Sequence, residues 1–411
     1  MLQSQLFTRT SKTAPKEEEA INAILLTRAG FVDKLMSGVY TFLPLGLRVI
    51  HRISQIIREE MNAVGGQEVS MPVLHPKKNW EQTDRWNSVD ILFKFTSYYT
   101  KTDLVLGPTH EEVVTPLLKK FILSYKDLPR AVFQIQNKFR DELRAKSGLM
   151  RGREFLMKDM YSFHASEADL DEYYEKAKIA YETIFKRVGL GKQTVLTYAS
   201  GGTFSKYSHE YQTIVETGED NVFLCQKCNI AVNKEIIADQ STCPQCGNKD
   251  LKPVKAAEVG NIFKLGTKFS KPFEFQYKDQ SGSLQDIWMG CYGIGISRLM
   301  GVVVEAFHDD KGMIWPESIA PYQIHLICLD DTSKTKSDIL YQELQKNQIE
   351  VLYDDRMDKT PGEKLADADL IGIPYRVILS ERTGDNIEIK KRSESDIKLI
   401  SKKELFVQMG K

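Results

Sequence analysis

The sequence predicts an α+β protein with an antiparallel sheet and flanking helices, a small cysteine-bearing insertion and a C-terminal α/β domain. Between residues 131 and 163, two stretches alternate apolar and polar residues, as strands with one buried face do. Two Cys-x-x-Cys pairs follow between residues 225 and 246. After residue 319, apolar stretches of strand and helix length alternate in a βαβαβ order, which is typical of an α/β domain.

Length, composition and charge restrict the class of protein. The 411 residues suffice for two or three domains, and contents of 42% apolar and 27% charged residues are ordinary for a soluble globular protein. Lys plus Arg and Asp plus Glu both number 56, so any contact with a nucleic acid must use a local basic patch. No apolar run approaches the ~20 residues that span a bilayer, and residues 1–19 lack an apolar signal core. We therefore expect a cytoplasmic protein without a membrane partner.

Residues 131–140 and 153–161 predict two antiparallel strands joined by a basic loop. In the first strand, one face carries Phe133, Ile135 and Phe139, and the other carries Gln134, Gln136, Lys138 and Arg140. In the second strand, one face carries Arg153, Phe155, Met157, Asp159 and Tyr161. Between Lys138 and Lys158, seven Lys or Arg residues stand against three Asp or Glu residues. Such a surface suits a ligand with phosphates and a flat base, and a solvated edge hairpin is the alternative.

These strands carry a pattern that resembles a known family. Phe139-Arg140-x-Glu142, a loop and Arg151-x-x-x-Phe155 resemble motif 2 of the class II aminoacyl-tRNA synthetases, and REFLMKDMYSFH resembles the bacterial type of prolyl-tRNA synthetase. The resemblance implies that Arg140 bridges the substrate carboxylate and the α-phosphate of ATP. It further implies that Glu142 accepts from the adenine amino group, Arg151 meets the terminal phosphate and Phe155 stacks on the base.

The loop between the two strands departs from the family pattern. It reads RAKSG, where the family often has RPRFG. By resemblance, Arg144 and Lys146 in this loop would contact the acceptor end of the tRNA.

Two segments before the hairpin extend the resemblance. Residues 15–63 predict a helical region broken around Pro44-Leu45-Gly46, followed by a strand over residues 67–71 that leads into Pro72. This helix, strand and proline resemble motif 1, which implies a homodimer, and SGVYTFLPLG and EVSMPVLHP resemble segments of the prolyl enzymes.

An apolar strand over residues 104–106 ends at the sequence GPTHEE. By resemblance, Thr109 and Glu111 would hold the amino group of L-proline, whose secondary ammonium has two N–H donors for two acceptors. His110 between them is interpreted as structural. From composition alone, a glutamate such as Glu112 equally fits the first turn of a helix.

Residues 165–188 predict an amphipathic helix, and the sequence SHEY that begins at Ser208 follows it. SHEY resembles the family's SHEF, which implies that His209 and Glu210 lie near the substrate. This chain carries extra residues between Gly202 and Ser208, and a structural His–Glu pair is the alternative.

The four cysteines at 225, 228, 243 and 246 predict a zinc ribbon. Fourteen residues separate the two Cys-x-x-Cys pairs, and two such turns complete a tetrahedral all-thiolate site. Four thiolates leave no open position, so the expected Zn²⁺ is structural; disulfides or free thiols are the alternative. Most bacterial-type prolyl enzymes carry a large editing domain here that removes mischarged alanine. Because only about residues 220–255 fill the gap, we expect that the ribbon replaces that domain and that editing in cis is absent.

Two segments after the cysteines resemble the return to the catalytic domain. EVGNIFKLG, from Glu258, differs from the family pattern by Asn261 in place of His. WMGCYGIGISRL, from Trp288, reads as strand, glycine turn and helix but lacks the third glycine of a dinucleotide fingerprint. It resembles motif 3, in which Arg298 would clamp the terminal phosphate. Cys291 is interpreted as a small apolar wall beside the proline ring rather than as a nucleophile.

The C-terminal region predicts strands at residues 323–329, 350–353, 375–379, 387–391 and 397–400, with helices at 337–347 and 362–370 and a short terminal helix. Asp354-Asp355-Arg356 and Gly372-Ile373-Pro374 resemble the anticodon-binding domain of class IIa synthetases. We therefore predict a catalytic domain at 1–219 and 256–318, the insertion at 220–255 and an anticodon-binding domain at 319–411.

Taken together, the resemblance implies a ligase that uses ATP, Mg²⁺ and a structural Zn²⁺ to join L-proline to its tRNA. A class II synthetase for another amino acid, such as threonine, is one alternative, although threonyl enzymes use an open zinc site. A catalytically inactive RNA-binding paralogue is the other, and it would be expected to lack Arg140, Glu142 or Arg298.

Overall fold

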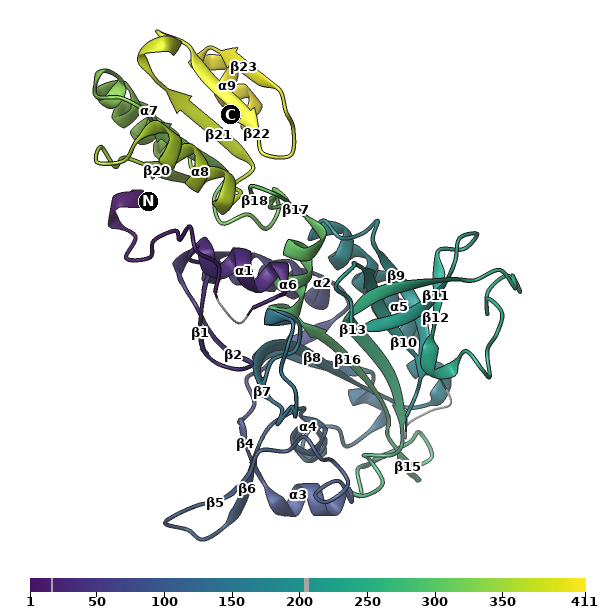
Figure 1. The fold of residues 1–411 in the computed structure, drawn as a ribbon. Coiled ribbons are helices and arrows are strands. Elements are labelled where there is room, and N and C mark those ends of the chain that lie inside the picture. The colour runs from purple at the N-terminus through teal and green to yellow at the C-terminus, as the bar shows by residue number, and fades with distance from the viewer. Residues whose placement is uncertain (16–17, 203–206) are drawn as a thin grey trace. The chain divides into compact units, whose positions relative to one another are not determined.

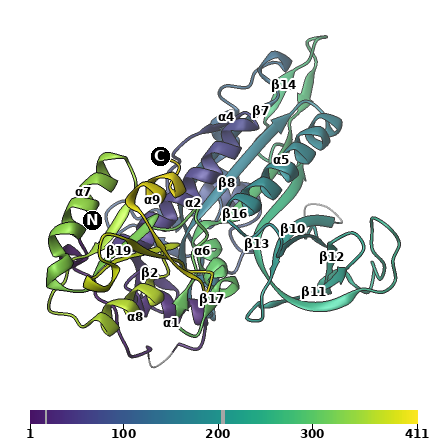
Figure 2. The same cartoon turned by 90° about the horizontal axis from the view of Figure 1, so that it is seen from above.

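A computed structural model of the chain describes residues 1–15, 18–202 and 207–411 (Figures 1 and 2). The chain divides into two compact units, and each is described by itself. One comprises Met1–Leu35, Tyr40–Arg52 and Val303–Lys411, and the other comprises Met36–Val39 and Ile53–Val302. No helix in the described part of the chain is both long and apolar enough to cross a lipid bilayer.

The unit that contains the predicted hairpin is built on a nine-stranded sheet. Its strand order is β10-β9-β12-β11-β13-β16-β8-β7-β3, and only the β3–β7 and β9–β12 pairs are parallel. The strands are β3 (Gly66–Glu68), β7 (Arg130–Phe139), β8 (Glu154–His164), β9 (Thr194–Ser200), β10 (Tyr207–Ile214), β11 (Asp220–Cys225), β12 (Ile230–Asn233), β13 (Lys252–Gly266) and β16 (Trp288–Gly295).

The predicted antiparallel hairpin is confirmed as β7 and β8. Lys138 lies opposite Phe155, Gln136 opposite Met157, and Gln134 opposite Asp159. Because directly opposed residues share a face, the polar face of β7 and the Phe155 face of β8 form one surface. β8 is flanked by β16 and β7, so the hairpin does not form an edge of the sheet and the alternative of a merely solvated edge is excluded.

The helix predicted at 165–188 is confirmed as α5 (Glu167–Arg187), which packs along β8 and β16 (Figure 2). Ser166 caps its N-terminus by accepting a hydrogen bond from the Asp169 amide. Its apolar residues form a buried stripe that continues just past its end: Leu170, Tyr174, Ala177, Tyr181, Ile184 and Val188.

β9 to β13 close into a small barrel. β10 pairs with β13 as well as with β9, so the five strands form a ring (Figure 2). Four small buried residues form its core: Val195, Val222, Ala231 and Ala256. β13 continues beyond the ring to pair with β16, and one strand is thereby shared by the barrel and the main sheet.

The prediction of a helical region over residues 15–63 is wrong between residues 32 and 42. The helices there are α1 (Ile21–Arg28) and α2 (Pro44–Ala63), and a hairpin of β1 (Val32–Met36) and β2 (Val39–Phe42) lies between them. Gly30 and Gly38 have left-handed φ values of 71° and 76°, which end α1 and turn the hairpin. Pro44 begins α2 instead of breaking a helix, because the first turn needs no amide hydrogen.

The other unit carries a five-stranded sheet of order β20-β19-β21-β22-β23. β19 is parallel to β20 and β21, and the remaining pairs are antiparallel. The elements are β19 (Ile324–Cys328), α7 (Lys334–Lys346), β20 (Val351–Asp354), α8 (Pro361–Ile371), β21 (Tyr375–Leu379), β22 (Ile387–Lys391), β23 (Ile397–Ile400) and α9 (Lys402–Gln408). The predicted βαβαβ order is confirmed. The first residues of the chain lie on its edge strand, where Leu2 bridges to Tyr353.

Short elements complete the described chain: α3 (Lys77–Gln82), α4 (Glu111–Leu118), α6 (Ile296–Ala306), β4 (Leu74–Pro76), β5 (Lys94–Thr96), β6 (Asp103–Leu106), β14 (Gln276–Lys278), β15 (Leu284–Asp286), β17 (His308–Asp309) and β18 (Gly312–Met313). Residues 107–110 join β6 to α4, and α6 follows β16 directly. These two junctions carry GPTHEE and the glycine turn to the face formed by β7 and β8.

Candidate active site

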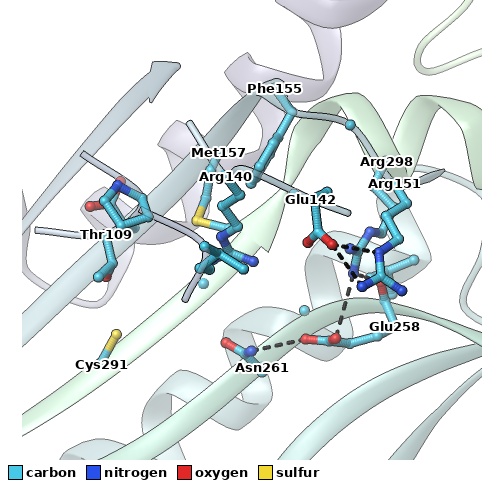
Figure 3. Close-up of a pocket in the computed structure, with 18 of the residues that line it drawn as sticks. Thr109, Arg140, Glu142, Arg151, Phe155, Met157, Glu258, Asn261, Cys291 and Arg298 are labelled. Atoms are coloured by element: carbon cyan, nitrogen blue, oxygen red, sulfur yellow. Dashed lines mark hydrogen bonds and ion pairs between the residues drawn. The ribbon is translucent and has the colours of Figure 1, made fainter. Parts of the chain in front are cut away.

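A cavity of about 180 Å³ lies on the face of the sheet that β7, β8, β13 and β16 form. Eight of the residues that the sequence singled out line it: Thr109, Glu111, Arg140, Glu142, Arg151, Phe155, Cys291 and Arg298. Figure 3 shows Thr109 and Cys291 at one end, Glu142, Arg151 and Arg298 at the other, and Arg140 between them. Segments more than 180 residues apart in the sequence, from Thr109 to Arg298, thus contribute to one site.

The first end of the cavity offers two hydrogen-bond acceptors. Thr109 Oγ1 donates to Glu111 Oε2 at 2.5 Å, which leaves the lone pairs of the hydroxyl and the second carboxylate oxygen for a ligand. Tyr161 Oη accepts from the His110 amide at 2.8 Å and lies 3.3 Å from Thr109 Oγ1. Glu111 and Glu112 both lie in the first turn of α4, and only Glu111 lines the cavity.

A buried ion pair lies beneath this end. Lys138 Nζ is 2.8 Å from Asp159 Oδ1, and the Lys138 side chain has no exposed surface. Tyr161 Oη and Gln134 Nε2 each donate to Asp159 Oδ2 at 3.0 Å. Burial lowers the pKa of Lys138, and the Asp159 carboxylate opposes this effect. The pair therefore fixes opposite charges next to the acceptors.

Arg140 occupies the middle of the cavity without a carboxylate partner. Within the described residues, none forms an ion pair with it, and its Nε has no hydrogen-bond partner. Its guanidinium carbon lies 5.2 Å from the centre of the Phe155 ring. Burial, and then repulsion from Arg298, lower the pKa of Arg140. An unpaired, partly buried guanidinium is a site for an anion.

Polar contacts link the side chains at the second end (Figure 3). Arg151 donates to Glu142 Oε2 from Nε at 2.9 Å and from Nη2 at 2.7 Å. Arg298 donates to the Met150 carbonyl from Nε at 2.7 Å and to the Glu258 carbonyl from Nη1 at 2.9 Å. Two arginines are thereby held at one end of the cavity, which suits a ligand with several negative charges.

Comparison with known proteins decides which family this geometry belongs to. The tRNA synthetase class II core domain (G, H, P, S and T) matches residues 93–307, and the anticodon binding domain matches residues 323–408. A proline–tRNA ligase of Wolbachia is 40% identical over 411 residues, which cover 96% of this chain and 96% of the relative. The chain belongs to the prolyl-tRNA synthetases. A proline–tRNA ligase of Dehalococcoides mccartyi strain 195 is 34% identical over 556 residues, covering 97% of both proteins.

Solved structures of prolyl-tRNA synthetases share the fold. The Cryptosporidium parvum enzyme with halofuginone and AMPPNP superposes with a TM-score of 0.78 at 19% identity, over 95% of this chain and 76% of that one. The Giardia lamblia enzyme with prolyl-adenylate gives a TM-score of 0.76 at 20% identity, over 93% and 74% of the two chains. The fold predicted from the sequence, a class II core with an anticodon-binding domain, is confirmed.

Four further residues that the resemblance placed near the substrates do not line the cavity: His209, Glu210, Arg144 and Lys146. His209 lies opposite Ile262 on β13, whereas its neighbours Asn261 and Phe263 line the cavity. Because alternate residues of a strand face opposite sides, this register turns His209 away from the cavity. Its Nδ1 lies 2.8 Å from the Tyr174 hydroxyl, whereas Glu210 accepts from Gln212 and Asn233, so the two residues do not form the alternative His–Glu pair. Of the extra residues that precede Ser208, 203–206 lie outside the described residues.

The other two are in the loop between β7 and β8. Arg144 and Lys146 are exposed and do not line the cavity. Lys146 Nζ lies 3.5 Å from a carboxylate oxygen of Glu219, which also accepts from the Ser147 hydroxyl at 3.1 Å. Their predicted contact with the tRNA acceptor end stays a prediction.

Three residues to which the sequence assigned no role also line the cavity: Arg85, Asp159 and Glu258. Arg85 follows α3, outside every recognised motif, and no local pattern marks it. Asn261, the departure from the family pattern, donates to Glu258 Oε1 at 2.9 Å (Figure 3). Glu210 on the neighbouring strand faces Glu258, and burial together with that carboxylate raises the pKa of Glu210 to about 8.

The four predicted metal ligands lie together at the end of the barrel. The Sγ atoms of Cys225, Cys228, Cys243 and Cys246 are all within 4.8 Å of one another. Cys225 and Cys246 are 3.7 Å apart, far beyond a disulfide and close to the edge of about 3.8 Å of a tetrahedron with Zn–S bonds of about 2.3 Å. The two turns match, because the amides of Asn229 and Gly247 bond to the carbonyls of Cys225 and Cys243. The donor set therefore fits Zn²⁺.

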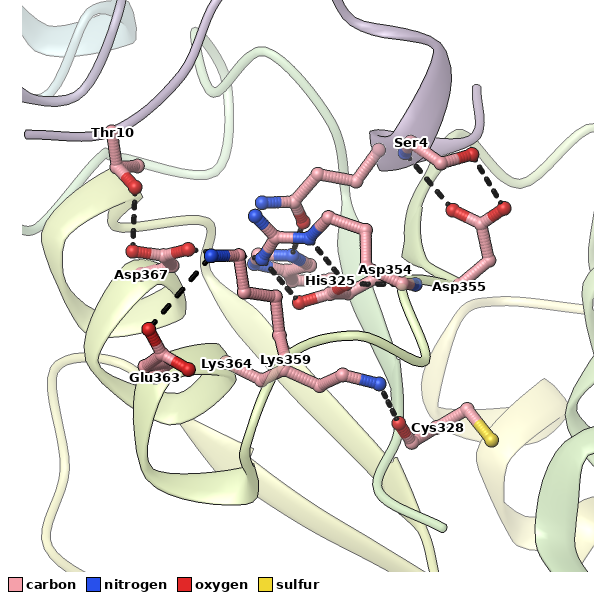
Figure 4. Close-up of polar contacts among 12 residues, drawn as sticks. Ser4, Thr10, His325, Cys328, Asp354, Asp355, Lys359, Glu363, Lys364 and Asp367 are labelled. Atoms are coloured by element: carbon pink, nitrogen blue, oxygen red, sulfur yellow. Dashed lines mark hydrogen bonds and ion pairs between the residues drawn. The ribbon is translucent and has the colours of Figure 1, made fainter. Parts of the chain in front are cut away.

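In the unit with the five-stranded sheet, Asp354, Asp355 and Arg356 are all engaged in contacts. Arg356 donates twice to Asp354 and once to Asp367, at 2.7–2.9 Å. Asp355 accepts from the amide and the hydroxyl of Ser4 at 3.0 and 2.7 Å (Figure 4). These contacts fix the segment, and its contact with an anticodon stays a prediction.

Proposed function

We propose that this chain activates L-proline with ATP to give prolyl-adenylate and transfers the prolyl group to the 3′ end of the proline tRNA. One observation carries the proposal: Arg140, which has no ion-pair partner among the described residues, lies between the Thr109–Glu111 acceptors and the Arg151–Arg298 end of a single cavity. The family to which the chain belongs and the names of its relatives agree with this assignment.

Each end of the cavity takes one part of the substrates. Thr109 and Glu111 accept from the secondary ammonium of proline, and Cys291 forms a small wall beside its ring. Glu142 accepts from the adenine amino group and Phe155 stacks on the base. Arg151 and Arg298 bind the terminal phosphate. Arg140 holds the carboxylate of proline against the α-phosphate, so that the two reacting groups meet in line.

Activation needs no general base, because a carboxylate is already nucleophilic. The carboxylate oxygen attacks the α-phosphate, the bond to the β-phosphate breaks and pyrophosphate leaves with the electron pair. Arg140, Arg151 and Arg298 neutralise the phosphate charge that develops. Mg²⁺ bound to ATP would supply further neutralisation, and the Glu258 carboxylate in the cavity would offer it an oxygen ligand of the type that it prefers. The 3′-hydroxyl of the tRNA then takes the prolyl group from the adenylate.

The charges around the ammonium end favour a cation. The carboxylates there are Glu111, Glu112 and Asp159, against the two cations Arg85 and Lys138. Arg85 pairs with both glutamates and Lys138 pairs with Asp159, so these ion pairs leave one carboxylate charge for the ammonium of proline. The charge of Arg140 is left for the carboxylate of proline. Charge alone does not select proline over other amino acids, and the shape of the wall near Cys291 does so.

A structural Zn²⁺ is proposed for the four cysteines, where it would tie the β11–β12 turn to the segment before β13. We further propose that residues 220–255, which carry these cysteines, stand in place of an editing domain. The alignment to the Dehalococcoides relative extends over 556 residues, so many residues of that protein have no counterpart in this chain. The Wolbachia relative aligns over 411 residues without such a difference.

The remaining assignments are proposed on the family resemblance alone. They are a homodimer, a cytoplasmic location, contact of Arg144 and Lys146 with the tRNA acceptor end, and contact of residues 354–356 with the anticodon. The domain boundaries at 1–219, 220–255, 256–318 and 319–411 belong to the same proposal.

ATP–pyrophosphate exchange screened across all amino acids tests the proposal. We expect exchange with proline alone. Exchange with another amino acid, such as threonine, would assign the chain to a different synthetase activity. No exchange with any amino acid, together with binding of the tRNA, would identify an RNA-binding paralogue.

A further inference from the structure

Arg85 reaches the ammonium end of the cavity from outside the recognised motifs. It follows α3, its side chain is 19% exposed, and it lines the cavity. Its guanidinium carbon lies 5.1 Å from the centre of the Trp80 ring and 5.3 Å from that of Phe269. Contact with two aromatic rings restricts the position of the guanidinium, so its charge is held at a defined place.

The Arg85 guanidinium forms ion pairs with two adjacent carboxylates. Arg85 Nη1 is 2.7 Å from Glu112 Oε1 and 3.7 Å from Glu111 Oε2. Glu112 has no exposed surface, and its Oε2 has no hydrogen-bond partner within the described chain. Burial raises the pKa of Glu112, and the charge of Arg85 opposes this effect. Glu112 therefore depends on Arg85 to stay ionised.

We infer that Arg85 is a positioning residue for proline, which keeps Glu111 and Glu112 ionised together so that Glu111 meets the substrate ammonium as a full carboxylate. The inference rests on the proposed function. Two neighbouring buried carboxylates do not both stay ionised without a cation. Without Arg85, the pair takes up one proton, and the ammonium of proline must displace that proton when it binds.

The other titratable groups that face Glu111 do not change their protonation state near neutral pH. They are Lys138, Arg140, His75, Tyr161 and Cys291. Burial lowers the pKa of His75 to about 4 and raises the pKa values of Tyr161 and Cys291, so these three stay neutral. Lys138 is paired with Asp159 at 2.8 Å. A pH dependence that appears on loss of Arg85 therefore reports the Glu111–Glu112 pair.

The test is the KM for proline in ATP–pyrophosphate exchange by the full chain at two pH values, about 6 and about 8. For Arg85→Gln we expect a KM for proline that is about tenfold higher at the lower pH, because binding is linked to release of one proton. The wild type and Arg85→Lys, which keep a cation, show a much smaller change. The KM for ATP is unaltered, since Arg85 lies at the opposite end of the cavity.

The double variant Arg85→Gln/Glu112→Gln separates this role from simple packing. It leaves Glu111 as a lone carboxylate with no proton to share, so the pH dependence disappears and the KM for proline falls back toward the wild-type value. A double variant that stays pH-dependent, or an Arg85→Gln whose KM rises equally at both pH values, would overturn the inference.

Two further variants complete the design. Glu112→Gln leaves Arg85 to neutralise Glu111, so the KM for proline rises at both pH values; a wild-type KM in this variant would also overturn the inference, even if Arg85→Gln does not fold. Arg187→Gln, which loses pairs with Glu59 and Glu60 away from the cavity, is the matched control with wild-type behaviour. A wild type that does not exchange with proline would instead refute the proposed function.

Discussion

Glu142 and Arg151 are bonded to each other, although they are proposed to bind opposite ends of ATP. Both hydrogen bonds run from the guanidinium to Glu142 Oε2, at 2.9 and 2.7 Å. Arg151 is 42% exposed on its side chain, whereas Glu142 is 14% exposed. ATP must therefore replace this ion pair with contacts of its own, and the exposed arginine is the partner free to move.

Substitution of Arg151 should weaken the binding of ATP without affecting the binding of proline. For Arg151→Gln we expect a KM for ATP about tenfold higher, in line with loss of one charged hydrogen bond, because the terminal phosphate loses its partner. The KM for proline changes by less than about twofold, since Thr109 and Glu111 are untouched. Steady-state pyrophosphate exchange measures both constants. An equal rise in both would show that Arg151 acts on the whole cavity.

Arg140 should be needed for the chemical step itself. Its guanidinium has no ion-pair partner in the described chain and lies between the two substrate ends. Arg140→Ala is expected to lower kcat/KM for exchange by at least about 100-fold, on the order of 3 kcal/mol of transition-state stabilisation. Arg140→Lys recovers only part, because an ammonium does not bridge two anions as a guanidinium does. Exchange near the wild-type rate in Arg140→Ala would contradict the assignment.

The cysteine cluster should hold one zinc ion per chain. Cys243→Ser is expected to lose most of that zinc, because three thiolates and a hydroxyl bind it more weakly. Elemental analysis of the purified proteins measures the content. Cys328→Ser is the control, since Cys328 is buried in the other sheet and outside the cluster. Equal zinc in both variants, or none in the wild type, would exclude the site.

The chain should not remove alanine from the proline tRNA. With only residues 220–255 in place of an editing domain, alanyl-tRNA for proline mixed with the enzyme should lose its ester no faster than in buffer. A prolyl-tRNA synthetase known to edit in cis serves as the positive control. Rapid deacylation by this chain would show that a hydrolytic site exists elsewhere in it.

Glu210 should make the barrel less stable as the pH rises. Its pKa in the folded chain is about 8, above the ordinary value of about 4.3, because it is buried and faces Glu258. Between these values the folded state keeps a proton that the unfolded state releases, so the free energy of unfolding falls by up to about 1.4 kcal/mol per pH unit.

Glu210→Gln removes this titration. The unfolding temperature of the variant should exceed that of the wild type by a margin that grows between about pH 6 and pH 8 and then stays constant. Thermal unfolding followed by circular dichroism measures the margin. Glu175→Gln is the control, because Glu175 is exposed and forms a surface pair with Lys178. A margin that is independent of pH would contradict the raised pKa.

The parts of the fold that were predictable are those in which local pattern and tertiary contact agree. β21, β22 and β23 match their predicted ranges because each is a short apolar stretch bounded by turn residues. The hairpin at residues 32–42 is not predicted, because its apolar residues also fit a helical period. The left-handed conformations of Gly30 and Gly38 end the helix before it and form its turn. Local periodicity does not register such a conformation.

The residues of the candidate site fall into the same two groups: those marked by a local pattern and those placed only by tertiary contacts. Thr109, Arg140 and Arg298 lie in motifs with a recognisable spacing, and the structure brings them to one cavity. Arg85 stands alone between two tryptophans in the sequence, and only the tertiary fold brings it to Glu111. The direction of His209 depends on the pairing of β10 with β13, which no local pattern contains.

The sharing of β13 between the barrel and the main sheet has a consequence for engineering. Residues 256–262 pair with β10, and residues 260–266 pair with β16. Because the two pairings share one strand, the register of the barrel also sets the register of the strand that lines the cavity. A slip of one residue would exchange Asn261 for Ile262 at the cavity wall. A module grafted at this position will preserve adenylate formation only if it leaves the pairing register of β13 with β16 unchanged.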